Sequence, residues 1–288
     1  SDYTSEKMDL RLLDHQFEDP EASELDARIN NTTFEAALKI RAELVVKTTG
    51  EVREAEIYMG QYPWMTERGS FVINGAERVV VGQLVRSPGV MFSMNESALG
   101  KKLYSAKMNP VRGSWLEIDI AANGSISVKV DKKKKIPLTI FLKAIGFSSN
   151  TEIEKAFKDV NNGDTDFIQE TLKKDSTKNQ SEALIEVFSR LRPGEMATVD
   201  NAKSLIEGML FNFKRFDFGK VGRYKINRRL KLDAPFDASG RILRKEDLVA
   251  TISELIRLSN SGDSADDMDS LANRRVRLVG ELLEQQFR

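Results

Sequence analysis

The sequence contains no cysteine and one histidine, His15, in 288 residues. The lack of cysteine excludes disulfide bonds, thiol nucleophiles and cysteine-based zinc sites, and a single histidine argues against histidine clusters and a Ser-His-Asp triad. No apolar run approaches the roughly 18 residues needed to cross a bilayer, and no signal-peptide pattern opens the sequence. We therefore predict a soluble cytoplasmic protein that does not contact a membrane.

Recognised catalytic motifs are also missing. The sequence has no phosphate-binding G-x-x-x-x-G-K-[ST] loop, no G-x-G-x-x-G, no G-x-S-x-G and no H-E-x-x-H. One carboxylate cluster remains, Asp266, Asp267 and Asp269, because closely spaced aspartates can hold two Mg²⁺ ions. The flanking serines and glycine favour a flexible, solvated acidic loop instead.

Net charge is absent as well, because 44 basic residues balance 44 acidic ones. A nucleic-acid role would therefore depend on local basic patches, and for each patch a solvated surface is the alternative interpretation. The patches are Lys101-Lys102, Lys132 to Lys135, Arg228-Arg229, and the triplet Arg274, Arg275 and Arg277.

The pattern in the first part of the chain is typical of β-strands. Apolar residues alternate from Leu38 to Val46, and Thr49-Gly50 supplies a turn before a second strand from Glu51 to Met59. A second hairpin is predicted from Leu116 to Val130, with Asn123-Gly124 at its turn.

After Pro137 the period changes to that of helices. We predict one helix from an N-cap at Ser181 to Leu191, another from Ala202 to Phe213, a third from Asp247 to Leu258, and a last amphipathic helix from Val276 to Phe287. The phenylalanines between Phe211 and Phe218 are predicted to fill a core rather than stack on bases. The fold class is therefore α+β.

Two arginines have settings typical of binding sites. Arg86 precedes Ser87-Pro88-Gly89, which would hold its guanidinium in one orientation. Arg112 lies near Trp115, and an unpaired base can stack on indole and hydrogen-bond to guanidinium. A buried tryptophan that covers a core is the alternative for Trp115.

A long stretch of motifs resembles the β subunit family of bacterial DNA-directed RNA polymerases. It begins with "GSFVINGAERVVVGQLVRSPGV" and continues in the family's order through "NPVRGSWLEIDI", "VDKKKKIPLTIFLKAIGF", "RLRPGEMATVDNAKSLIEGMLF", "RFDFGKVGRYKINRRL" and "DDMDSLANRRVRLVGELLEQQFR". The resemblance runs from about Met8 to Arg288. It implies an N-terminal portion of a longer subunit, which agrees with a last helix that has no stop signal.

The resemblance implies a nested domain layout. A strand-rich protrusion would comprise residues 1–132 and 240–288, and a largely helical lobe, residues 133–239, would be inserted into it. Composition changes near Pro137 and Pro235 agree with these boundaries.

By resemblance, the two domains line the downstream DNA cleft and contact the non-template strand. The chain would have no catalytic residue, metal site or cofactor of its own, because the Mg²⁺ of the assembled, nucleoid-associated nucleotidyltransferase is held mainly by the β′ subunit. Other partners would be the α and ω subunits and a sigma factor. The residues predicted to contact nucleic acid are Arg86, Trp115, Lys132, Lys133, Lys134, Lys135, Arg274 and Arg275.

The family also implies two further surfaces. Val52, Arg53 and Glu54 match an edge that docks the transcription-repair coupling factor and, in some bacteria, a CarD-type regulator. Arg78 and Val81 match positions near the rifamycin pocket, whose main wall this sequence lacks. Because the net charge is zero, a protein-interaction platform with negligible DNA affinity remains the alternative function.

The sequence departs from the family at two positions in its last motif. Ser270 and Ala272 stand where the family usually has His and Gly. These changes affect the turn before Arg274 and Arg275, and so the detailed role of those arginines.

Overall fold

A computed structural model describes residues 6–97 and 100–287. The chain forms two compact units, the first from Ser1–Gln83 and Arg277–Arg288, the second from Leu84–Val276. Helices and antiparallel sheets both occur, so the predicted α+β class is confirmed. The three-part division at residues 132/133 and 239/240 stays a prediction, and both positions lie inside the second unit. No described helix is both long and apolar enough to span a bilayer.

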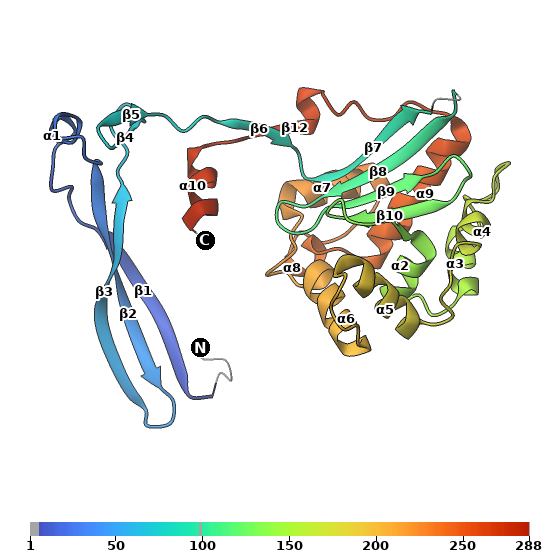
Figure 1. Cartoon of the computed structure of the whole chain (residues 1–288), viewed down its shortest axis with the longest axis horizontal. Coiled ribbons are helices and arrows are strands. Elements are labelled where there is room, and N and C mark those ends of the chain that lie inside the picture. The colour runs from blue at the N-terminus through green and yellow to red at the C-terminus, as the bar shows by residue number, and fades with distance from the viewer. Residues whose placement is uncertain (1–5, 98–99, 288) are drawn as a thin grey trace. The chain divides into compact units, whose positions relative to one another are not determined.

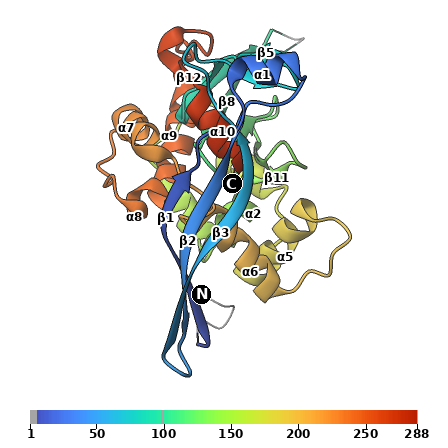
Figure 2. The same ribbon diagram turned by 90° about the vertical axis from the view of Figure 1, so that its left-hand side faces the viewer.

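The first unit contains a long three-stranded antiparallel sheet in the order β1-β2-β3 (Figure 2). The predicted hairpin at Thr49-Gly50 is confirmed, because Gly50 has a φ of 73° and its N–H donates to Val46 O at 2.8 Å. Only the central strand is substantially buried, and β3 is an edge strand. The strands are β1 (Met8–Phe17), β2 (Glu35–Val46) and β3 (Glu51–Pro63).

Short elements complete the first unit. Ser23 caps α1 through a reciprocal hydrogen-bonded capping box with Asp26. Ring contacts join Phe17 to Trp64, with centroids 5.3 Å apart, and Tyr62 to Phe287, with centroids 5.5 Å apart. The elements are α1 (Glu24–Ile29), β4 (Phe71–Ile73), β5 (Ala76–Arg78) and α10 (Val279–Phe287).

The second unit is built on a five-stranded antiparallel sheet in the order β11-β10-β9-β8-β7. Burial alternates along β9 and β10, as the sequence pattern predicts, and Gly124 adopts a φ of 86° in the turn between them. The strands are β7 (Gly89–Glu96), β8 (Lys102–Asn109), β9 (Leu116–Ile120), β10 (Ile126–Val130) and β11 (Ile136–Pro137).

Helices pack on this sheet and share one apolar core with it (Figure 1). The helices α7 and α9 contact β7 and β8, whereas α2 and α4 contact β10. Of the phenylalanines predicted to fill a core, Phe216 and Phe218 are fully buried, whereas Phe211 and Phe213 are only partly buried. The helices are α2 (Leu138–Ala144), α3 (Asn150–Phe157), α4 (Phe167–Leu172), α5 (Gln180–Leu191), α6 (Val199–Ile206), α7 (Gly219–Leu230), α8 (Ala238–Arg241) and α9 (Lys245–Ser261).

Three sequence predictions of helix limits are wrong. The N-cap of α5 is Asn179 rather than Ser181, because the Asn179 side chain accepts from the Glu182 N–H at 2.9 Å. The helix predicted to reach Phe213 changes at residue 207 into a π-helical turn, η1 (Glu207–Phe211). Val276 lies in a strand, β12 (Arg274–Arg277), which follows the 3-10 turn η2 (Leu271–Asn273) and pairs with β6 (Gln83–Arg86).

Candidate nucleic-acid interface

Trp115 is held by a tight turn that follows β10. Its N–H donates to Asp131 Oδ1 at 2.8 Å, and the Asp131 N–H donates to Trp115 O at 3.0 Å. Asp131 and Lys132 both adopt positive φ, 49° and 60°, and the Lys133 N–H closes the turn on Val130 O at 3.0 Å. Left-handed backbone is unfavourable for both residues, so tertiary contacts must maintain this turn.

The Trp115 indole is accessible. The residue is 43% exposed, so it is not the buried cover over a core that the alternative interpretation required. Lys132 Nζ lies 5.9 Å from the ring centroid, within range of a cation–π contact. The structure thus brings together an aromatic face and an ammonium group, two of the residues that the sequence analysis selected.

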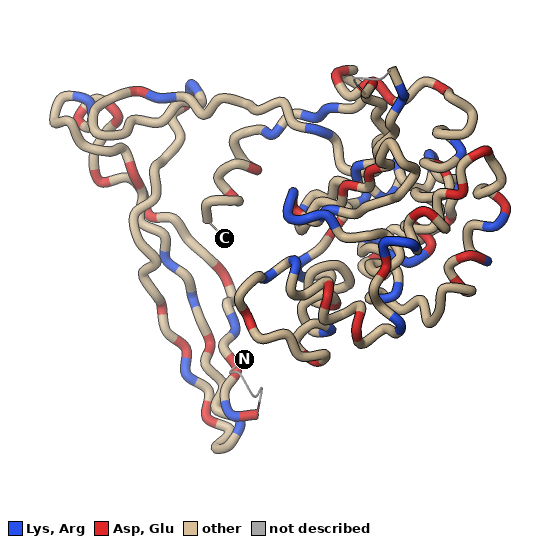
Figure 3. The backbone as a smooth tube through the Cα atoms, turned by 45° about the vertical axis from the view of Figure 1, so that its right-hand side comes forward, with Lys and Arg blue, Asp and Glu red and all other residues tan. Residues whose placement is uncertain are grey.

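The other residues of the lysine run are exposed, and Figure 3 shows how lysine and arginine are distributed along the backbone. Lys133 Nζ donates to Leu191 O at 3.1 Å, where the carbonyl groups at the end of α5 favour a cation. Arg190 Nη1 donates to Lys135 O at 2.5 Å and so fixes the backbone of the run. Within residues 6–97 and 100–287, the ammonium groups of Lys134 and Lys135 have no hydrogen-bond or ion-pair partner.

Arg86 is exposed at the end of β6. The backbone after it is well held, because the Ser87 N–H donates to Asn273 O at 2.9 Å and Pro88 packs against Gly222 of α7. Gly89 follows with a φ of 131°. The backbone after Arg86 is therefore tied to β12 and α7, but the Arg86 guanidinium has no hydrogen-bond or ion-pair partner in the described part of the chain, and its predicted fixed orientation stays a prediction.

Arg274 and Arg275 lie on β12, the strand that pairs with β6, so they share a two-stranded ribbon with Arg86. Arg274 forms an ion pair with the Asp269 carboxylate. Sequence reasoning did not identify this pair. No hydrogen bond or cation–π contact between described residues joins Arg86 to Trp115, and the roles of all eight predicted contact residues stay predictions.

The aspartate cluster is not arranged as a metal centre. Asp266 accepts from the Phe92 N–H at 2.9 Å and pairs with Arg229 at 3.3 Å, whereas Asp267 accepts from the Asp269 N–H at 2.9 Å. Among the described residues, no three carboxylate or histidine side chains are grouped so that they could hold a metal ion.

The three residues predicted to dock a regulator lie on an edge strand of the first unit. Val52, Arg53 and Glu54 are on the edge strand β3, and Val52 is 54% exposed. Arg53 Nε lies 2.8 Å from Glu51 Oε1 on the same strand. Their docking role stays a prediction.

The two residues matched to the rifamycin region lie in the first unit. Arg78 ends β5 and lines an apolar groove of about 830 Å³, together with aromatic residues such as Trp64 and Phe287. Val81 is 76% exposed and is not part of the groove.

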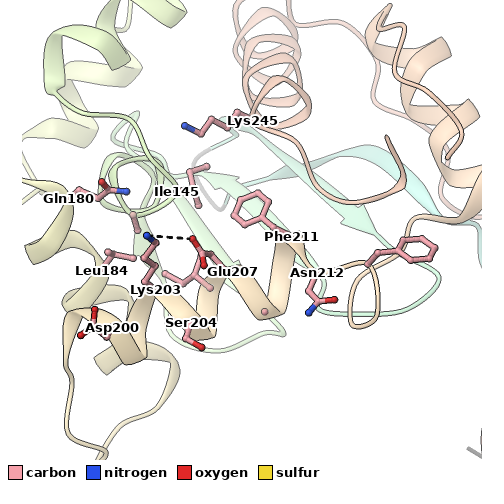
Figure 4. A pocket seen from close by; sticks show the side chains of 14 residues that line it. Ile145, Gln180, Leu184, Asp200, Lys203, Ser204, Glu207, Phe211, Asn212 and Lys245 are labelled. Carbon is pink, nitrogen blue, oxygen red and sulfur yellow. Dashed lines mark ion pairs between the residues drawn. The ribbon is translucent and has the colours of Figure 1, made fainter. Parts of the chain in front are cut away.

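A cavity of about 1000 Å³ in the second unit contains none of the predicted residues (Figure 4). Lys203 and Glu207 on its wall form an ion pair at 3.9 Å, and Lys245 Nζ donates to Gly146 O at 3.0 Å. Its acidic and basic groups thus offset one another, and sequence patterns gave no signal for it because α2, α5, α6 and α9 all contribute to its wall.

The comparison with known families identifies the chain. The family model for RNA polymerase Rpb2, domain 2, matches residues 86–277, nearly the same residues as the second unit. The chain belongs to the RNA polymerase β-subunit family. The resemblance stated from the sequence motifs is therefore confirmed.

Curated bacterial β subunits are similar over the whole chain. The DNA-directed RNA polymerase subunit beta of Syntrophomonas wolfei is 43% identical over 288 residues, which is 100% of this chain and 25% of the relative. The subunits of Chloroflexus aggregans and Dehalococcoides mccartyi are each 41% identical, and the chain covers 26% and 23% of them. The chain thus spans about a quarter of the length of the curated relatives it matches.

Proposed function

We propose that this chain acts within the β subunit of a bacterial DNA-directed RNA polymerase, where its second unit lines the downstream DNA cleft and contacts the non-template strand. One observation carries the proposal: the accessible indole of Trp115, whose backbone is hydrogen-bonded to Asp131, lies beside the Lys132 ammonium. Stacking on an indole is tolerant of base identity, and an ammonium attracts the neighbouring phosphate.

Each group has a distinct task in this proposal. Trp115 stacks on an unpaired base, and Arg86 donates hydrogen bonds from its planar guanidinium to the edge of that base. Lys132 to Lys135 act as point charges on downstream phosphates, which positions the DNA without reading its sequence. Arg274, oriented by Asp269, and Arg275 extend the basic surface along β12.

Nucleotidyl transfer would belong to the assembled enzyme. In this proposal the β′ subunit holds most of the Mg²⁺ site, the α and ω subunits and a sigma factor complete the assembly, and the present chain positions DNA. The chain would then have no catalytic activity alone.

The test uses a reconstituted polymerase whose β subunit carries this sequence. A photo-crosslinkable base placed along the non-template strand should label the segment around Trp115. The double variant Arg86→Ala with Trp115→Ala should destabilise the open complex by about 1 to 3 kcal/mol, the value of one stacked base, whereas Trp115→Phe retains an aromatic face and much of the stability. Unchanged open-complex lifetimes in the double variant would contradict the base-contact role.

A second candidate is a protein-interaction platform, and the exposed edge strand β3 favours it. An edge strand presents unpaired backbone groups that can extend a partner's sheet, and Val52 is exposed on this edge. The partner would be the transcription-repair coupling factor or a CarD-type regulator.

A pull-down with the polymerase-interacting domain of the coupling factor tests this candidate. Arg53→Ala with Glu54→Ala should weaken capture, whereas Arg41→Ala, on the central strand β2, should leave it unchanged. Equal capture by all three proteins would rule out docking at this edge.

A further inference from the structure

The helix α7 has one buried face and one exposed face of opposite chemical character. Gly222, Arg223 and Ile226 are buried against the rest of the second unit. Lys220, Val221, Tyr224, Arg228 and Lys231 are exposed, and Lys225 is partly exposed beside them. Positions 220, 224 and 228 follow helical spacing, so Tyr224 lies between two cations on this face, and Lys231 follows as the C-cap residue with a φ of 55°.

This exposed face, which we call the α7 basic face, has no acidic residue. The twelve residues of α7 include five basic side chains and no Asp or Glu. Two of the five are neutralised inside the unit, Arg223 by Asp247 and Arg229 by Glu254 and Asp266. In residues 6–97 and 100–287, the charged groups of Lys220, Arg228 and Lys231 have no hydrogen-bond or ion-pair partner.

Nearby acidic groups do not cancel this charge. Asp217, just before the helix, is bound by Arg241 and accepts from the Gly219 N–H at 2.6 Å. Asp233, beyond the helix, is exposed, but its one negative charge is outnumbered by the positive charges of Lys220, Lys225, Arg228 and Lys231.

Helix stability explains only part of the pattern. Cations are favourable in the last turn of a helix, which accounts for Arg228. Lys220 is in the first turn, where the helix dipole disfavours a cation; that turn contains no acidic residue, and the N-cap residue Phe218 makes no side-chain cap bond. Tyr224 is 53% exposed on this face, so burial of its ring contributes little to the stability of the fold.

We propose that the α7 basic face binds single-stranded nucleic acid, with Lys220, Arg228 and Lys231 on successive phosphates and the Tyr224 ring stacked on one base. The choice of occupant rests on charge complementarity and on the tyrosine, since a base-tolerant aromatic platform beside cations is the usual chemistry of single-strand binding. An acidic peptide or duplex DNA would use the cations but has no need of an accessible aromatic face.

The face adjoins the candidate interface described above. Lys225 Nζ donates to Ala272 O at 3.0 Å, two residues before Arg274, and Pro88 after Arg86 packs on Gly222. The inference thus rests on the proposed function and extends it, because it adds a second contact for the same strand.

Fluorescence anisotropy of the full chain with a labelled oligothymidylate of about 12 nucleotides, within the site sizes of single-strand grooves, tests the inference. Tyr224→Leu should weaken binding on the order of tenfold, and Tyr224→Phe should bind within about twofold of the parent because stacking is retained. The double variant Lys220→Gln with Arg228→Gln should make the slope of log Kobs against log salt shallower by about 1.4, because each phosphate that the protein no longer neutralises reduces the slope by about 0.7.

The matched control is Lys155→Gln, on α3, combined with Lys158→Gln at the C-cap of that helix. It removes the same charge from an exposed helix of the same unit that also carries acidic residues. Its salt slope should equal that of the parent, which separates a local contact from an effect of net charge.

Several results would overturn the inference. One is a salt slope that is the same in the Lys220→Gln with Arg228→Gln variant as in the α3 control variant. Another is binding of duplex DNA or polyglutamate that is as tight as that of the oligothymidylate and is unchanged by Tyr224→Leu. The third is the absence of binding by the parent at about 100 µM, the weak limit of non-specific binding. The double variant Arg86→Ala with Trp115→Ala is measured separately in the same assay. If the α7 variants weaken binding while Arg86→Ala with Trp115→Ala does not, the α7 contact stands and the Trp115 contact fails; the reverse result removes only the α7 contact.

Discussion

Arg223 and Asp247 form a two-pronged ion pair inside the second unit. Arg223 Nη1 lies 2.6 Å from Asp247 Oδ1 and Nη2 lies 2.8 Å from Oδ2, and both side chains are fully buried. Nη2 also donates to Ile242 O at 2.9 Å, and Asp247 Oδ2 accepts from the Arg244 N–H at 3.0 Å. The pair therefore ties α7 to the start of α9 and orients the α7 basic face outward.

Asp247→Asn should destabilise the second unit by about 3 to 5 kcal/mol, because it leaves the Arg223 charge buried without a counter-charge. Arg223→Lys should also destabilise it, since one ammonium cannot reach both carboxylate oxygens in this geometry. Urea unfolding followed by tryptophan fluorescence measures the effect. In a Trp64→Phe background the only tryptophan is Trp115, which lies in the second unit.

Glu246→Gln is the control for this pair. Glu246 is the neighbouring acidic residue, but its side chain is 61% exposed and it pairs with Arg244 at the surface. Its removal should change the free energy of unfolding by less than about 1 kcal/mol. An Asp247→Asn effect equally small would show that the buried pair is not needed for stability.

The variant Lys132→Gly should lose affinity for single-stranded DNA without losing stability. Lys132 adopts a φ of 60°, a conformation that disfavours a side chain by about 1 kcal/mol or more and that glycine adopts freely. The variant should therefore unfold at equal or higher urea concentration, yet bind single-stranded DNA more weakly because the cation beside Trp115 is gone. Reduced stability together with unchanged binding would indicate that Lys132 serves the fold and not the interface.

Local patterns predicted the elements whose geometry is fixed by neighbouring residues. The hairpin from β9 to β10 was predicted because its alternation and its Asn123-Gly124 turn are both local signals. The start of α5 was misplaced because Asn179 and Ser181 are both good N-caps; the Asn179-x-x-Glu182 spacing was the signal that distinguished them. Val276 was assigned to a helix because its pairing with β6 involves residues about 190 positions earlier, and no local period records such pairing.

The candidate interface was predicted only in part for the same reason. Trp115 and Lys132 were identified from residue type and resemblance, and the structure places them side by side. Asp131, whose side chain accepts from the Trp115 N–H, was overlooked because the two residues flank β9 and β10 and meet only through the register of those strands. The absence of acidic residues in α7 could be seen in the sequence. Which of its basic residues are exposed could not, because that depends on which face of the helix packs against the rest of the unit.

Gly240→Ala should destabilise the second unit, whereas Gly280→Ala should stabilise the first. A Cβ at Gly240 would lie 1.9 Å from Pro235 O, so the backbone would have to shift at a cost of about 1 to 3 kcal/mol or more. A Cβ at Gly280 in α10 meets no atom within 4 Å, so alanine should add up to about 1 kcal/mol through helix propensity. Trp115 and Trp64, each as the single tryptophan, report the two units separately, and effects of the same sign would contradict this assignment.

The buried pair of Lys143 and Asp175 should make the second unit sensitive to acid. Lys143 Nζ lies 2.9 Å from Asp175 Oδ2 with both side chains almost fully buried, and the Thr177 N–H and hydroxyl donate to Asp175 Oδ1 at 2.8 and 2.7 Å. Burial opposes ionisation of Asp175, but the hydrogen bonds from Lys143 and Thr177 outweigh it and lower its pKa below the ordinary value of 3.8.

A carboxyl group with a lowered pKa in the folded state stabilises the fold fully above its unfolded-state pKa, and this contribution is lost as the pH falls through the folded-state pKa. Asp175→Asn should therefore be clearly less stable than the parent near pH 7, and the difference should shrink below about pH 4, where the parent carboxylate also loses its advantage. Asp159→Asn, an exposed carboxylate on the same unit, should show almost no difference at any pH. Urea midpoints measured from about pH 7 to about pH 3 would contradict the prediction if the Asp175→Asn difference stayed constant, because a pH-independent loss would mean that the carboxylate contributes through packing rather than through its charge on Lys143.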